Sequence, residues 1–215
     1  MTDAQVRKDL AAVYREVGRR GLIVGSSGNV SHRTRTGMII TPSGCSADAL
    51  DAGGLVAMTL SGDVNGMTAP SSEWAMHAAI YLAYPSAQCI VHAHADACTA
   101  LACLNEALPP FHYMVANFGG NDVRCAPYVT FGTPELARLA VAALAGRTAC
   151  LLANHGMIAH APTAERALSG AIVLESLCRQ YLLARSAGAV RMLTADEMRA
   201  AHERFRSYGQ PGARV

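Results

Sequence analysis

The 215-residue sequence lacks the long apolar run that a membrane span requires. No unbroken run of apolar residues exceeds seven, as in Leu139 to Ala145, whereas a helix that crosses a bilayer needs about 20. The first ten residues are charged and contain no apolar stretch of the kind found in a secretory signal. From these absences we expect a cytoplasmic protein that does not bind membranes.

A strong charge of either sign is also missing. The formal net charge is +2 and only 16% of the residues are charged, which argues against a nucleic-acid partner. Hydrophobic residues make up 51% of the chain, so it can bury a core and is not a disordered segment. The length and even composition predict a single domain over residues 1–215.

Closely spaced cysteine pairs are absent, and lysine is scarce. The seven cysteines are odd in number and none forms a C-x-x-C motif, so neither a disulfide framework nor a thiolate zinc cluster is expected. Among the 18 basic residues, the only lysine is Lys8, which lies opposite the apolar stripe of a predicted first helix. An enzyme that forms a Schiff base needs a lysine in a desolvated pocket, and Lys8 does not suit that role.

Periodicity and turn residues predict alternating helices and strands. Helices are expected over 3–20, 71–84, 96–105, 133–144, 163–187 and 194–207, and strands within 29–41 and over 55–60, 88–94 and 149–153. A long irregular segment, 106–131, separates the third and fourth helices. The interleaving predicts an α/β fold with a mixed central β-sheet covered by helices on both faces.

Three histidines follow two of these predicted strands. His92 and His94 are two residues apart, so a strand directs both imidazoles to one face. His155 follows the apolar run Cys150 to Ala153 and precedes a glycine. Three imidazoles would leave one position open on a tetrahedral ion, as in a catalytic metal site. The alternative is that three buried histidines are hydrogen-bonded separately, as we expect for His77 and the remaining histidines, which have no partner motif.

Small polar residues form a second candidate site. Glu73 follows Ser71 and Ser72 at a predicted helix start, where backbone N–H groups favour negative charge. Together with the loops 25–29 and 43–44, which are also rich in serine and glycine, these residues could bind a phosphate. No G-x-x-x-x-G-K motif is present, so this is not a P-loop, and ordinary turns are an equal alternative.

Taken together, the motifs resemble the class II, metal-dependent aldolases of the L-fuculose-1-phosphate aldolase type, which share a fold with L-ribulose-5-phosphate 4-epimerase. The resemblance covers essentially the whole chain. The matching segments are Gly28-Asn29-Val30-Ser31, Thr41-Pro42-Ser43-Gly44, Ser71-Ser72-Glu73-Trp74, Val91-His92-Ala93-His94, His112-Tyr113-Met114, Gly119-Gly120-Asn121, Ala126-Pro127-Tyr128, Thr130-Phe131-Gly132-Thr133, Asn154-His155-Gly156 and Tyr208-Gly209.

The resemblance implies one divalent ion per subunit, Zn²⁺ first and Mn²⁺ or Co²⁺ as alternatives. Its ligands would be His92, His94 and His155, with Glu73 as a ligand in the resting site and as a base when substrate arrives. Tyr113, from a neighbouring subunit of a homotetramer, would be the proton donor to the aldehyde side. The implied phosphate-binding residues are Gly28, Asn29, Ser43, Gly44, Ser71 and Ser72, and the implied aldehyde pocket contains Phe131 and Tyr208.

The expected reaction is reversible cleavage of a ketose 1-phosphate to dihydroxyacetone phosphate and a small aldehyde, with the ion stabilising the enediolate. L-Fuculose 1-phosphate and the 5-deoxy- or 5-methylthiopentulose 1-phosphates are the candidate substrates. The main alternative is a 4-epimerase, in which aspartate takes the place of Glu73. Dehydratases and decarboxylases of the same fold are further alternatives. A non-catalytic module like the adducin head is disfavoured because all four candidate metal ligands are present.

Overall fold

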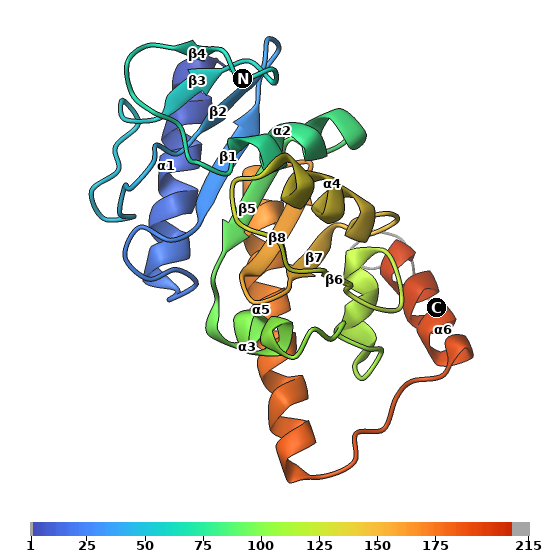
Figure 1. The fold of residues 1–215 in the computed structure, drawn as a ribbon. Coiled ribbons are helices and arrows are strands. Elements are labelled where there is room, and N and C mark those ends of the chain that lie inside the picture. Colours follow the sequence, from blue (N-terminus) through green and yellow to red (C-terminus); the bar gives the residue numbers. More distant parts are fainter. Residues whose placement is uncertain (1, 208–215) are drawn as a thin grey trace.

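Short apolar segments form the centre of the fold. The computed structural model describes residues 2–207, and its strands form one eight-stranded sheet in the order β4-β3-β2-β1-β5-β8-β7-β6 (Figure 1). Among the described strands, only β6 and β7 pair in parallel. The predicted mixed sheet is therefore confirmed. The strands are β1 (Asn29–Arg33), β2 (Met38–Ile40), β3 (Val56–Met58), β4 (Val64–Asn65), β5 (Cys89–Ala93), β6 (Cys125–Ala126), β7 (Ala149–Leu152) and β8 (Gly156–Ala161).

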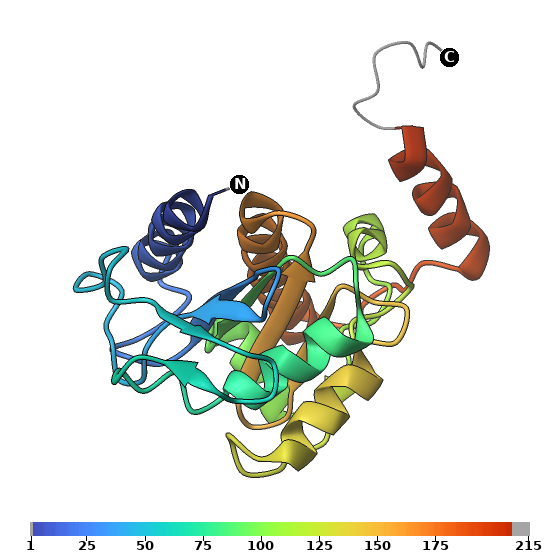
Figure 2. The same cartoon turned by 90° about the horizontal axis from the view of Figure 1, so that it is seen from above.

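Helices cover both faces of this sheet, as predicted. In Figure 2, α1 and α5 lie on one side of the sheet and α2 and α4 lie on the other. Alternate strand residues enter two separate apolar clusters, because successive side chains of a strand point to opposite faces. The helices are α1 (Asp3–Arg19), α2 (Trp74–Ala83), α3 (Asp96–Cys103), the 3₁₀ helix η1 (Tyr113–Phe118), α4 (Pro134–Ala143), α5 (Ala164–Ala187) and α6 (Ala195–Ser207).

The helix ends follow the capping chemistry of the sequence in most places. Thr133 and Thr163 accept hydrogen bonds from backbone N–H groups at the starts of α4 and α5. Thr194 and Glu197 form a reciprocal pair of capping bonds at the start of α6, where the sequence predicts a helix. No helix within residues 2–207 combines the length and apolar character needed to cross a membrane.

Local structure differs from the sequence-based prediction in three places. Neither Ser71 nor Ser72 caps α2, because the cap position is occupied by Glu73, whose side chain makes no capping bond. Residues 156–161 form β8, which we did not predict because its six residues are all buried and show no alternation. The turn-rich segment after residue 60 includes the short strand β4, which is exposed and paired with β3.

The strand order brings distant segments to one end of the sheet. Both β5 and β7 are antiparallel to β8, which lies between them, so β5 and β7 run in the same direction and end together. On the other side of β5, Asn29 at the start of β1 is paired with His92. The carboxyl ends of β5 and β7 and the beginning of β1 therefore meet near the start of α2.

Candidate metal centre and substrate cleft

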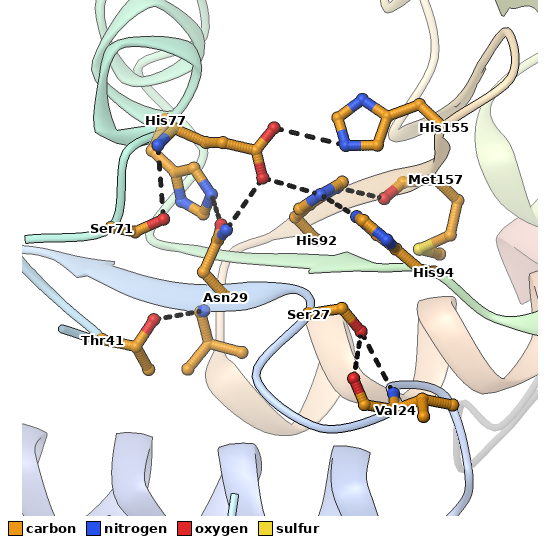
Figure 3. A network of polar contacts seen from close by, with 12 residues as sticks. Val24, Ser27, Asn29, Thr41, Ser71, His77, His92, His94, His155 and Met157 are labelled. Carbon is orange, nitrogen blue, oxygen red and sulfur yellow. Dashed lines mark hydrogen bonds and ion pairs between the residues drawn. The ribbon is translucent and has the colours of Figure 1, made fainter. Parts of the chain in front are cut away.

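Four potential metal ligands converge at this end of the sheet. Donor atoms of Glu73, His92, His94 and His155 all lie within 4.8 Å of one another. The Nε2 atom of His92 is 3.1 Å from Nε2 of His94 and 3.0 Å from Oε2 of Glu73. The Nε2 atom of His155 is 3.3 Å from Oε1 of Glu73. Figure 3 shows the three imidazoles directed toward one another, from β5, from the residue that follows it and from the turn that precedes β8.

Two glycines allow the backbone to approach these ligands. A Cβ atom at Gly28, where φ is +77°, would lie 2.7 Å from the carbonyl oxygen of His92. A Cβ atom at Gly156 would lie 2.4 Å from the carbonyl oxygen of Ala93 and 3.2 Å from the ring of His94. Contacts this short exclude a larger side chain unless the backbone shifts. Glycine at these positions therefore permits the loops to close around the site.

A backbone carbonyl orients the most buried ligand. The Nδ1 atom of His92 lies 2.8 Å from the carbonyl oxygen of Met157, and since a carbonyl can only accept, Nδ1 carries the proton (Figure 3). In the neutral ring the lone pair is then on Nε2, which faces the other ligands. A hydrogen bond from the second ring nitrogen of a histidine to a carbonyl is typical of a metal ligand.

The donor set fits a divalent cation. Oε1 of Glu73 is buried and accepts no hydrogen bond among the described residues, although Nε2 of His155 lies 3.3 Å from it. A buried carboxylate oxygen that accepts no hydrogen bond is costly, and a cation would satisfy it. Three imidazole nitrogens and one carboxylate suit zinc and other first-row divalent ions. The four residues could therefore hold a divalent ion.

Burial and mutual charge set the protonation of the site. Burial lowers the pKa of His94 to about 4, with a further contribution from His92, and it lowers the pKa of His155 to about 4 in the same way. Burial alone would raise the pKa of Glu73, but the imidazoles of His92 and His155 outweigh it and hold this pKa well below its ordinary value. His94 and His155 are therefore neutral and Glu73 is ionised near pH 7. Burial would lower the pKa of His92, but its contact with Glu73 outweighs this effect and raises the pKa, so a metal ion would compete there with a proton.

A cleft of about 310 Å³ opens beside the four ligands, and its size suits a small ligand. All six residues that the resemblance assigned to phosphate binding line it. Two of its loops are joined by backbone bonds from Ser43 to Ala69 and from Ser71 to Thr41, each 3.0 Å long. The candidate phosphate residues on the cleft are Gly28, Asn29, Ser43, Gly44, Ser71 and Ser72.

The aromatic candidates are placed differently. Phe131 lines the cleft, and its side chain is exposed. Tyr113 does not line the cleft: it begins η1, is 53% exposed and stacks on the rings of His112 and Phe205. Within one copy of the chain, the structure therefore does not bring Tyr113 to the candidate ligands. Tyr208 lies outside the described residues.

Ser26 and Ser27, which belong to the candidate phosphate loop 25–29, line the cleft beside Gly28. Sequence reasoning assigned no role to several other residues of the site. Tyr128, Val129 and Asn154 line it as well, but they show no spacing that would single them out. The largest omission is His77.

His77 is inside α2, as predicted, and is fully buried. Its imidazole is hydrogen-bonded to Asn29 and to Ser31, both of which come from β1. The four-residue spacing from Glu73 would have placed the two side chains on one side of a helix start. That spacing was the available signal for a histidine connected to the site.

Comparison with known proteins gives matches over most of the chain. Residues 8–182 match the family model described as the Class II Aldolase and Adducin N-terminal domain. A Rhodospirillum rubrum protein named 5-methylthioribulose-1-phosphate/5-deoxyribulose-1-phosphate aldolase is 44% identical over 204 residues, covering 95% of this chain and 92% of the relative. The Escherichia coli protein named L-fuculose phosphate aldolase is 42% identical over 195 residues, covering 90% and 91%.

Solved structures share the fold. A structure titled L-fuculose 1-phosphate aldolase superposes with a TM-score of 0.91 and 38% sequence identity, over 96% of this chain and 98% of that one. A second structure, titled as a putative aldolase/epimerase/decarboxylase from Klebsiella pneumoniae, has a TM-score of 0.85 and 30% identity. It covers 94% of this chain and 99% of the solved chain.

Proposed function

The chain belongs to the Class II Aldolase and Adducin N-terminal domain family and is a class II ketose 1-phosphate aldolase, and we propose how its residues carry out the reaction. The substrate is L-fuculose 1-phosphate or a 5-deoxy- or 5-methylthiopentulose 1-phosphate. The products are dihydroxyacetone phosphate and a small aldehyde. The observation that carries the proposal is that a cluster of four metal-type donors supplies three of them, Glu73, His94 and His155, to the same cleft that the candidate phosphate loops line.

The phosphate end of the substrate binds at the loops that contain Gly28, Asn29, Ser43, Gly44, Ser71 and Ser72. Hydroxyl, amide and backbone N–H groups are the donors that phosphate oxygens accept from. In support, these residues line the cleft beside Glu73, so a phosphate held there leaves the adjoining carbons of a ketose close to the carboxylate. Among the described residues that line the cleft there is no arginine, so the donors that they offer to a phosphate are neutral.

The metal ligands are His92, His94 and His155, with Glu73 as a fourth ligand in the resting site, and Zn²⁺ is the proposed ion. Bound there, the ion supplies a Lewis acid that stabilises the negative charge developing on the ketose oxygens as the C3–C4 bond breaks. The lack of any lysine among the cleft residues is consistent with this role, because the other common route in aldolases needs a lysine Schiff base.

Glu73 is the proposed base. In the direction of synthesis it removes a proton from the hydroxymethyl carbon of dihydroxyacetone phosphate, and in cleavage it returns that proton. Its carboxylate is ionised and buried, and Oε1 accepts no hydrogen bond among the described residues, so a proton acceptor faces the site. The environment of Glu73 thus supports this role.

Tyr113 is the proposed proton donor to the aldehyde oxygen, supplied by a neighbouring copy of the chain. Its exposure and its position outside the cleft of its own chain support an action in trans. We propose a homotetramer in which each cleft is completed in this way, with Phe131 lining the aldehyde side together with Tyr208.

The test is release of dihydroxyacetone phosphate from four substrates, the 1-phosphates of L-fuculose, L-rhamnulose, 5-deoxyribulose and 5-methylthioribulose. We expect release that stops after chelation and returns when Zn²⁺ is added, and the fastest substrate identifies the aldehyde. Metal-loaded protein that releases nothing from any of them contradicts the proposal. Epimerisation of L-ribulose 5-phosphate would then be assayed.

A further inference from the structure

A chain of buried hydrogen bonds extends from the interior of α2 to the carboxylate of Glu73. Tyr81 Oη is 2.8 Å from Ser31 Oγ, which is 2.6 Å from Nδ1 of His77. On the other side of the ring, Nε2 of His77 is 2.5 Å from Oδ1 of Asn29. The amide nitrogen of Asn29 then lies 3.1 Å from Oε2 of Glu73. The contact between His77 and Asn29 can be followed in Figure 3.

All members of this chain are buried. Ser31, His77 and Tyr81 have no exposed surface, and Asn29 and Glu73 are 4% and 6% exposed. Water therefore does not compete for these bonds, and a member without its partner would pay the full cost of desolvation. Such a chain holds its side chains in one arrangement more firmly than the same contacts at the surface.

The charge of Glu73 decides the direction of each bond. An ionised carboxylate only accepts, so Asn29 must present its NH₂ group to Glu73 and its carbonyl oxygen to His77. Nε2 of His77 therefore carries the proton and donates it to Asn29. Nδ1 is then an acceptor and receives the hydroxyl hydrogen of Ser31, while Ser31 accepts from Tyr81.

Burial keeps this imidazole neutral. It lowers the pKa of His77 to about 3, with a smaller contribution from His92 and an opposing one from Glu73. A charged ring would have a second N–H at Nδ1. The neutral ring therefore accepts from Ser31 and donates to Asn29 at the same time.

We propose that His77 is a positioning residue for catalysis: its Nε2–H group fixes the amide of Asn29, which in turn holds the Glu73 carboxylate toward the candidate metal centre. This inference rests on the proposed role of Glu73 as base. With Oε2 bonded to the amide of Asn29, the same oxygen lies 3.0 Å from Nε2 of His92 and Oε1 lies 3.3 Å from Nε2 of His155, so the carboxylate faces the candidate ligands. Asn29 also lines the cleft, so one amide connects the carboxylate with the loops proposed to bind phosphate.

Two amide variants separate this role from mere packing. Glutamine can place an N–H group near the position of Nε2, so His77→Gln keeps the bond to Asn29. Asparagine is one methylene shorter and can replace only Nδ1, so His77→Asn keeps the contact with Ser31 and loses the one with Asn29. Both variants bury an amide in place of the imidazole, and a purely structural role predicts that they behave alike.

The first measurement is solvent exchange of the hydroxymethyl proton of dihydroxyacetone phosphate, made on zinc-loaded protein with metal content checked. We expect exchange about tenfold slower in His77→Asn, the loss that one hydrogen bond to a charged network produces, and within about threefold of wild type in His77→Gln. The KM for dihydroxyacetone phosphate should change less than kcat. Equal exchange rates in the two variants, whether both fast or both slow, overturn the proposal.

The second measurement needs neither variant nor activity. Nitrogen-15 NMR of metal-free, histidine-labelled wild-type protein at pH 7 should show His77 as the neutral tautomer protonated at Nε2. A ring protonated at Nδ1 overturns the proposal even if the variants fail to fold. If wild-type protein shows no proton exchange at all, Glu73 is not the base and the proposed function fails, which is a separate outcome.

Discussion

Stability in acid gives the sharpest test of the buried network. His77 is fully buried and its pKa is lowered to about 3, whereas the pKa of a histidine in an unfolded chain is about 6.5. Between these values the unfolded state binds a proton at this residue and the folded state does not. The free energy of unfolding of the metal-free protein must therefore fall as the pH falls through this range.

The magnitude follows from the size of the shift. One pKa unit corresponds to about 1.4 kcal/mol, so the full lowering of the His77 pKa amounts to at most about 5 kcal/mol, reached near pH 3. Between pH 7 and pH 5, where the folded protein survives more readily, the loss from this residue alone is about 2 kcal/mol. That is a large part of the stability of an ordinary domain.

The assay is urea unfolding of chelated protein at pH 7 and pH 5, followed by circular dichroism at one protein concentration. His77→Gln removes the titrating ring and is the matched comparison, since His94, His155 and Glu73 are present in both proteins. Wild type should lose about 2 kcal/mol more than His77→Gln between the two pH values. The same pH dependence in both proteins would refute the conclusion that His77 is buried and neutral.

Three further predictions concern the site itself. His155→Ala should lose bound metal, measured by mass spectrometry, together with turnover, measured as dihydroxyacetone phosphate release. The control His32→Ala changes a half-buried strand position outside the cleft and should keep both. Retained metal with full activity in His155→Ala would contradict the ligand assignment. Gly28→Ala should lower the free energy of unfolding, measured by thermal unfolding, by at least about 2 kcal/mol, because the residue has φ +77° and an added Cβ would meet the His92 carbonyl. Unchanged stability in Gly28→Ala would show that the loop backbone can shift without cost. Tyr113→Phe should slow cleavage while leaving proton exchange at dihydroxyacetone phosphate unchanged, and equal loss of both rates would assign Tyr113 another role.

Local patterns accounted for most of the elements. The apolar stripe of α1, the threonine caps of α4 and α5 and the capping box of α6 are interactions between residues a few positions apart, which the sequence displays directly. The strand β8 was not predicted, because a short segment buried on both faces has no alternation to detect. Its antiparallel pairing with both β5 and β7 is what brings His155 to His92 and His94.

By itself, the sequence determined which residues could coordinate a metal and that two of them, His92 and His94, share one face of a strand, since that spacing is a property of the extended backbone. The tertiary structure decided the rest. The tautomer of His92 depends on the Met157 carbonyl, and the environment of Glu73 depends on Asn29 and, through it, on His77. These partners are 44 to 65 residues apart, and bonds across such separations depend on strand order and helix packing rather than on any local pattern.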